Sequence, residues 1–169
     1  PRQIRRVHPP LPVKPTLIVV GAGIAGLAAA ILFGRSGWQV TVLERSDVIR
    51  SYGAGIYIWE NGIKVLMHLG IFHELQKHAL PAVARDARDG RNRRFRSNNT
   101  HPDFRVYTFV RQDLIAALHK AALNAGAEIR CGCEVLSAHR DGTVILAGDE
   151  VLSADLVVAA DGVGSRIRD

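Results

Sequence analysis

The clearest pattern along the chain is an apolar run that leads into a glycine-rich turn and then into helix-forming residues. Residues 17–20 are apolar and mostly β-branched, which predicts a buried strand. The glycine-rich segment 21–26 follows, and alanine and leucine then predict a helix over 24–36. A turn at Gly37 leads to a second predicted strand over 39–43. Strand, helix and strand in this order predict a right-handed crossover, and therefore an α/β fold with a parallel sheet.

The pattern changes after the second strand. Residues 45–56 are polar and rich in glycine, which predicts a long connecting loop. Asn61 is placed to cap a helix over 62–69, which Gly70 ends, and a shorter helix follows through Leu75.

The second half of the chain combines a hairpin, a helix and short strands. Residues 81–96 predict two polar strands around an Asp-Gly turn. A strand over 104–110 leads into an amphipathic helix over 111–124. From residue 127 onward we expect a third strand of the parallel sheet and a small antiparallel meander, and the last strand spans 156–160.

The glycine-rich turn has the residue types that a dinucleotide site needs. Gly21 permits a tight turn, Gly23 lets a diphosphate approach the backbone, and Gly26 lets the helix pack closely on the strand. Glu44, at the end of the second strand, can accept hydrogen bonds from ribose hydroxyls. The alternative is a glycine-containing turn beside a surface glutamate, but the order of all these parts favours a dinucleotide site.

A second group of residues follows the last predicted strand, which ends in Asp161-Gly162. Because ligands of open α/β sheets bind along the carboxyl ends of the strands, we expect the glycine turn, Glu44 and Asp161 to meet one elongated ligand. An alternative stays open, in which Asp161 only stabilises the following turn.

The length and composition of the chain are typical of a globular protein domain. The chain has 169 residues, enough for one domain with a sizeable core. It contains no apolar stretch of about 18 residues, so we expect neither a membrane span nor a signal peptide. Cys131 and Cys133 lie too close in sequence for a typical disulfide or zinc site and predict reduced thiols, which favours a cytoplasmic location. Residues 1–15 hold five of the seven prolines and predict an irregular tail.

The net charge of +6 raises the question of nucleic acid binding. The positive charge gathers in the tail and in the arginine-rich segment 85–96. Neither segment interleaves aromatic residues that could stack on bases, so no nucleic acid partner is predicted. A solvated hairpin, or a face that partner surface covers, explains this charge better.

With these motifs in place, the chain resembles the FAD-dependent aromatic-ring monooxygenases with the para-hydroxybenzoate hydroxylase fold. The resemblance covers residues 16–169. Segments 53–62 and 154–168 are most similar to the branch that oxidises N-heteroaromatic acids, such as methylhydroxypyridine carboxylate oxygenase and hydroxynicotinate monooxygenases. The matching motifs are residues 21–26, 43–45, 53–56, 111–114 and 160–168.

The resemblance implies a fold and a set of FAD contacts. The fold is a Rossmann-like FAD-binding domain with a parallel sheet, a β-meander and a partial substrate-domain hairpin. The glycine turn would hold the diphosphate, Glu44 the adenosine ribose, Leu136 the adenine, and Asp161 the diphosphate and ribityl chain, while Arg45 and Arg50 could instead be solvated loop charges. The implied cofactor-binding residues are Gly21, Gly23, Ala25, Gly26, Glu44, Arg45, Arg50, Gly55, Ile56, Arg111, Leu136, Asp161 and Gly162.

The resemblance also implies an activity. In this family NADPH or NADH reduces FAD, molecular oxygen adds to give a C4a-hydroperoxyflavin, and a small aromatic or N-heteroaromatic acid is hydroxylated. No residue shows a spacing that assigns it a catalytic role. Six of the seven histidines are interpreted as surface or helix residues, namely His68, His73, His78, His101, His119 and His139.

The chain differs from the family in length, because family members are more than twice as long. We therefore expect a tail over 1–15 and an FAD-binding domain over 16–169, in which residues 80–110 contribute to an incomplete substrate domain. The C-terminal half of the same enzyme is the expected partner, without which we predict no hydroxylation. The alternatives are another FAD-dependent oxidoreductase, or a non-catalytic module that uses the nucleotide fold to bind a partner.

Overall fold

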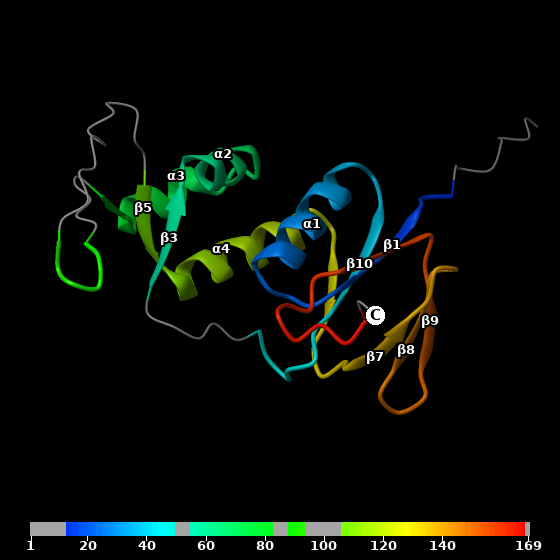
Figure 1. Cartoon of the computed structure of the whole chain (residues 1–169). Helices are drawn as coiled ribbons and strands as arrows, with labels where there is room; N and C mark the ends of the chain where they lie inside the picture. Colours follow the sequence, from blue (N-terminus) through cyan, green and yellow to red (C-terminus); the bar gives the residue numbers. More distant parts are fainter. Residues whose placement is uncertain (1–12, 50–54, 83–87, 94–105, 168–169) are drawn as a thin grey trace, which may run out of the picture.

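The computed structural model describes residues 13–49, 55–82, 88–93 and 106–167, and the structural statements below concern these residues. Strands and helices are interspersed up to α4, and short strands make up the rest of the described chain (Figure 1). In chain order the elements are β1 (Thr16–Val20), α1 (Ile24–Arg35), β2 (Gln39–Leu43), β3 (Gly55–Trp59), α2 (Glu60–His68), α3 (Phe72–Leu75), the 3₁₀ turn η1 (Gln76–His78), β4 (Leu80–Pro81), β5 (Val106–Val110), α4 (Arg111–Asn124), β6 (Glu128–Arg130), β7 (Val135–Ala138), β8 (Thr143–Leu146), β9 (Val151–Ser153) and β10 (Leu156–Ala159).

A parallel sheet of four strands, in the order β10-β1-β2-β6, forms the centre of the molecule. β1 pairs in parallel with β10 on one side and with β2 on the other, and β2 pairs in parallel with β6. The carboxyl ends of these strands therefore meet at one edge of the sheet, as the sequence predicts. This arrangement confirms the α/β fold.

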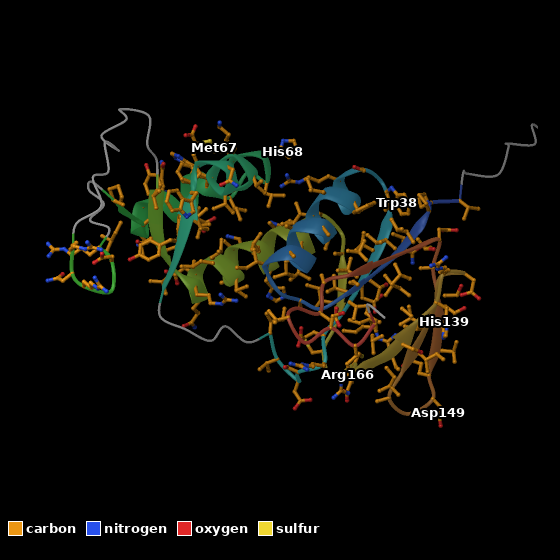
Figure 2. All side chains as sticks on the ribbon, in the orientation of Figure 1. Trp38, Met67, His68, His139, Asp149 and Arg166 are labelled. Atoms are coloured by element: carbon orange, nitrogen blue, oxygen red, sulfur yellow. The ribbon has the colours of Figure 1, made fainter. Side chains whose placement is uncertain are left out.

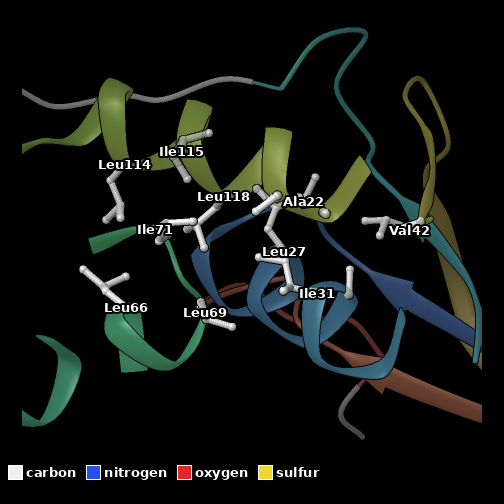
Figure 3. Packing of buried hydrophobic residues seen from close by; sticks show 14 of the residues in the cluster. Ala22, Leu27, Ile31, Val42, Leu66, Leu69, Ile71, Leu114, Ile115 and Leu118 are labelled. Carbon is white, nitrogen blue, oxygen red and sulfur yellow. The ribbon is translucent and has the colours of Figure 1, made fainter. Parts of the chain in front are cut away.

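The two faces of the parallel sheet are buried under different layers. Leu17 and Val19 of β1 face α1 and α4, whereas Ile18 and Val20 face the meander β7-β8-β9. This division follows from the alternation of side chains along a strand. Leu27 of α1 is fully buried in the helical layer, which Figure 3 shows in contact with the side chains of α4.

A second, antiparallel sheet stands beside this core, in the order β3-β5-β4. Ile56 and Ile58 of β3 pack against the hydrophobic cluster that also contains the buried side chains of α1 and α4. The ring of Phe72 in α3 contacts that of Tyr107 in β5 edge to face, with 5.5 Å between the ring centres. The helices α2 and α3 thus cover one face of this sheet (Figure 1).

Two predictions about this region are wrong. The predicted loop over 45–56 includes the start of β3, because alternating side chains over Gly55–Trp59 pair with β5. Asn61 does not cap α2: the helix begins at Glu60, and its N-cap residue Trp59 makes no side-chain capping hydrogen bond. Gly70 does end this helical segment, with φ of +72°.

The predicted hairpin is described only at its turn. The backbone N–H of Asn92 donates to the carbonyl oxygen of Asp89 at 2.9 Å, and Asp89 Oδ1 accepts from the N–H groups of Arg91 and Arg93. Residues 83–87 and 94–96 of the predicted strands lie outside the described residues. In the described part of the chain, no helix has the length and apolar character to cross a membrane.

Candidate dinucleotide site

A cleft of about 60 Å³ opens at the carboxyl edge of the parallel sheet. Its walls come from the segments that follow β1, β2 and β10, and from the start of β7. Ligand pockets usually measure about 300–1,000 Å³. The cleft is smaller than this, so the described residues form one part of a ligand site and do not enclose a whole ligand. The lining residues are Val20, Gly21, Leu43, Glu44, Arg45, Cys133, Glu134, Val135, Asp161, Gly164 and Arg166.

The backbone at Gly21 and Gly26 leaves no room for side chains. Gly21 has φ of +101°, and a Cβ there would lie 2.5 Å from the carbonyl oxygen of Ala160. Its N–H donates to the carbonyl oxygen of Leu43 at 2.7 Å, which ties the turn to β2. A Cβ on Gly26 would overlap the carbonyl oxygen of Gly21. Both glycines are therefore required by the packing of the turn itself.

Gly23 differs from these two glycines because its surroundings are open. A Cβ at this position would meet no atom within 4 Å. Gly23 is the N-cap residue of α1, and it provides no side-chain capping hydrogen bond. The first turn of α1 has no acidic residue either. The N–H groups at this helix end are therefore left for an external anion, and a diphosphate fits them.

Glu44 connects β2 to the glycine-rich turn. Its Oε2 accepts the N–H of Ala22 at 2.9 Å, and its Oε1 accepts the N–H of Ser46 at 3.0 Å. The side chain is half-buried and lines the cleft. Each carboxylate oxygen can accept a second hydrogen bond, so the group remains able to bind a ribose hydroxyl.

Asp161 follows β10 and lines the opposite side of the cleft. Its Oδ2 accepts the N–H of Arg166 at 3.1 Å, so it does stabilise the turn that follows it, the role that the sequence left open. Within the same segment the hydroxyl of Ser165 is buried without a hydrogen-bond partner. Gly162 has φ of +91°, which suits the sharp turn after the strand.

The structure brings together only some of the predicted site residues. Gly21, Glu44, Arg45 and Asp161 line the cleft, and Arg45 is exposed there. Other predicted residues lie outside its lining. Gly23 and Ala25 are exposed at the start of α1, buried Gly26 lies in its first turn, Gly55 and Ile56 begin β3, half-buried Arg111 begins α4, exposed Leu136 lies on β7, and Gly162 follows Asp161. Arg50 lies outside the described residues.

Cys133 and Glu134 line the cleft although the sequence does not predict them as site residues, and Arg166 is predicted only as part of the motif over 160–168. Glu134 Oε1 accepts a hydrogen bond from Nη1 of Arg166 at 2.9 Å. The loop between β6 and β7 brings these residues to the cleft, because the N–H of Cys133 donates to the carbonyl oxygen of Glu44 at 2.8 Å. The prediction at Leu136, close by in sequence, is the one signal that could have pointed to them.

The two thiols and the metal-ligating side chains of the described residues indicate no further chemistry. Cys131 and Cys133 are free thiols, and burial and nearby Glu44 raise the pKa of the Cys131 thiol, which keeps it protonated. No group of three or more histidine, cysteine, aspartate or glutamate side chains in the described part could hold a metal ion.

A parallel sheet with a glycine-rich turn, a free helix N-terminus and an acidic residue at the next strand end defines a dinucleotide-binding α/β domain. The family described as FAD binding domain matches residues 14–169. This chain belongs to that family.

Similar proteins are FAD-dependent monooxygenases. The chain is 44% identical over 153 residues to 2-heptyl-3-hydroxy-4(1H)-quinolone synthase from Mycobacteroides abscessus, covering 89% of this chain and 41% of that protein. It is 30% identical over 165 residues to 6-hydroxynicotinate 3-monooxygenase from Bordetella bronchiseptica, covering 92% and 43%. The crystal structure of 2-methyl-3-hydroxypyridine-5-carboxylic acid oxygenase, mutant C294A, superposes with a TM-score of 0.85 and 36% identity, covering 93% and 42%.

These comparisons confirm the resemblance to flavoprotein monooxygenases, including relatives from the N-heteroaromatic branch. They also show that the chain spans about two fifths of the length of these relatives.

Proposed function

We propose that this chain is the FAD-binding portion of a flavoprotein monooxygenase that hydroxylates an aromatic or N-heteroaromatic acid, with NADPH or NADH as reductant and molecular oxygen as co-substrate. One observation carries the proposal: the glycine turn, Glu44 and Asp161 line one cleft at the carboxyl edge of the sheet, beside a helix N-terminus without a cap. That arrangement suits the adenosine diphosphate part of FAD.

The chemistry of each residue supports a division of roles. Glu44 would bind the adenosine ribose, and the open N-terminus of α1 at Gly23 would bind the diphosphate. Asp161, with Gly162, would lie toward the ribityl chain. Arg45 is exposed at the cleft and can donate to phosphate or ribose oxygens. Roles for Arg50, Gly55, Ile56, Arg111 and Leu136 as further FAD contacts stay predictions.

Bound FAD would supply the redox chemistry by which oxygen is activated. The residues of this chain would bind the cofactor and orient it. The named relatives support the substrate class, because quinolone, nicotinate and pyridine carboxylate rings all contain a ring nitrogen. We therefore infer that the substrate ring is N-heteroaromatic.

The domain organisation belongs to this proposal. We infer a tail over 1–15 and an FAD-binding domain over 16–169, with residues 80–110 contributing to a substrate domain. The rest of that domain would come from a C-terminal portion corresponding to the unmatched part of the relatives. A cytoplasmic location and the absence of nucleic acid partners stay predictions.

Two measurements on the purified chain test this function. We expect the 169 residues alone to bind FAD saturably. We also expect that an aromatic acid does not stimulate NADPH oxidation by the 169 residues alone. Adding the unmatched C-terminal portion of the Mycobacteroides abscessus relative should restore NADPH oxidation in the presence of an N-heteroaromatic acid. Hydroxylation by the 169 residues alone would contradict the division into portions, and failure to bind FAD would contradict the function.

A further inference from the structure

Arg166 and Glu134 form an ion pair at the cleft. Nη1 of Arg166 lies 2.9 Å from Oε1 of Glu134. Both residues line the same cleft as Glu44 and Asp161. The pair joins the segment after β10 to the residue just before β7, and Figure 2 shows Arg166 near the loop that leads into β7.

We expect this ion pair to contribute little to the stability of the fold. The two side chains are 68% and 43% exposed, and exposed pairs contribute little to stability. The backbone of each partner is held by other bonds. The N–H of Arg166 donates to Asp161, and the carbonyl oxygen of Glu134 accepts the N–H of Ala147 at 2.8 Å. A role in orienting the side chains explains the pair better than a role in folding.

The charges around the cleft show what that orientation achieves. Three carboxylates line it, from Glu44, Glu134 and Asp161, together with the guanidinium groups of Arg45 and Arg166. Without Glu134, the long side chain of Arg166 is free to turn toward the other two carboxylates and occupy the ligand's space. Glu134 engages Nη1, and the planar guanidinium has further N–H donors that suit phosphate oxygens.

We propose that Glu134 is a positioning residue for FAD: it holds the Arg166 guanidinium at the side of the cleft, directed toward the adenosine diphosphate part of the cofactor. Arg166 in turn neutralises Glu134, whose carboxylate would otherwise repel the diphosphate. This inference rests on the proposed function.

A double-mutant cycle tests the proposal. The wild-type chain, Glu134→Gln, Arg166→Gln and the double variant are titrated with FAD by flavin fluorescence. We expect Glu134→Gln to weaken FAD affinity about fivefold, and Arg166→Gln to weaken it more than about tenfold. In the Arg166→Gln background, adding Glu134→Gln should strengthen FAD binding several-fold, because it removes an unpaired carboxylate. This change of sign between backgrounds is the result that a merely structural role does not produce.

Two controls complete the experiment. Thermal unfolding of the FAD-free variants should match the wild type. Glu150→Gln removes one partner of the partly exposed Arg130–Glu150 pair, which lies outside the cleft lining, and should leave FAD affinity unchanged. This inference alone is overturned if the wild-type chain binds FAD and the Glu134→Gln variant binds it with equal affinity. It is also overturned if Glu134→Gln changes FAD affinity in the same direction in both backgrounds. Absence of wild-type FAD binding overturns the proposed function and this inference with it.

Discussion

Oε2 of Glu44 accepts a hydrogen bond from the backbone N–H of Ala22 at 2.9 Å, which joins the end of β2 to the glycine-rich turn after β1. Ala22 is buried, so this carboxylate satisfies a polar group that water does not reach easily. The same side chain lines the cleft. One residue therefore holds the glycine-rich turn to β2 and places an acceptor at the cleft.

Replacing Glu44 should affect both stability and FAD binding. Glu44→Ala leaves the Ala22 N–H without its partner, and we expect a loss of about 1–3 kcal/mol in the free energy of unfolding. FAD affinity should fall more than about tenfold. Glu44→Gln keeps one oxygen acceptor and should lose less stability. Urea unfolding and FAD titration measure the two effects, and wild-type values for both in Glu44→Ala would disprove this dual role.

The glycines of the turn should separate folding from binding. A Cβ on Gly26 overlaps the carbonyl oxygen of Gly21, so Gly26→Ala should lower the free energy of unfolding by about 1–3 kcal/mol. A Cβ on Gly23 meets no atom, and its φ of −79° suits alanine. Gly23→Ala should therefore stay within about 0.5 kcal/mol of the wild type and still weaken FAD binding.

Thermal unfolding and FAD titration of the two glycine variants provide the comparison. The methyl group at position 23 stands where the diphosphate should approach, whereas that at position 26 acts on the fold. Equal FAD affinity in Gly23→Ala and the wild type would show that the ligand does not approach the backbone there.

Asp155 should make stability depend on pH. Hydrogen bonds from the N–H and hydroxyl of Thr16 hold the pKa of Asp155 below its usual value. Because the pKa in the folded state is lower than in the unfolded state, the stabilisation is fully present above about pH 4 and is lost as the pH falls through the folded-state pKa.

The measurement is urea unfolding of Asp155→Asn and the wild type at several pH values. We expect the variant to be less stable at neutral pH and the difference to shrink toward about pH 3. Thr16→Val removes the hydroxyl that bonds Asp155 and should reproduce the effect in part. A difference that does not change with pH would rule out the ionised carboxylate as its source.

The parts of the fold that the sequence predicts correctly depend on local signals. The β1-turn-α1-β2 unit follows from an apolar run, glycines at fixed spacing and a second apolar run, all within about thirty residues. Glu44 and Asp161 could be placed at the cleft because parallel strands share one edge.

The parts that the sequence misses depend on contacts between distant segments. β3 was not predicted because Gly55 to Trp59 become a strand only through pairing with β5, more than forty residues later. The sequence does not reveal Glu134 because its loop carries no periodic pattern. The loop is placed by contacts with distant segments, among them the hydrogen bonds from the N–H of Cys133 to the carbonyl oxygen of Glu44 and from the N–H of Gly132 to that of Ser46. The cap at Asn61 failed because residue type alone does not fix where a helix begins.

The most direct test of the central claim is a titration of the purified chain with FAD, with ADP and FMN as competitors. Our proposal assigns the adenosine diphosphate part of FAD to this cleft, whose described walls enclose only about 60 Å³. We therefore predict saturable binding of one FAD per chain with micromolar or weaker affinity, displaced by ADP and not by FMN. No saturable binding up to about 1 mM FAD, or displacement by FMN as effective as that by ADP, would contradict the claim.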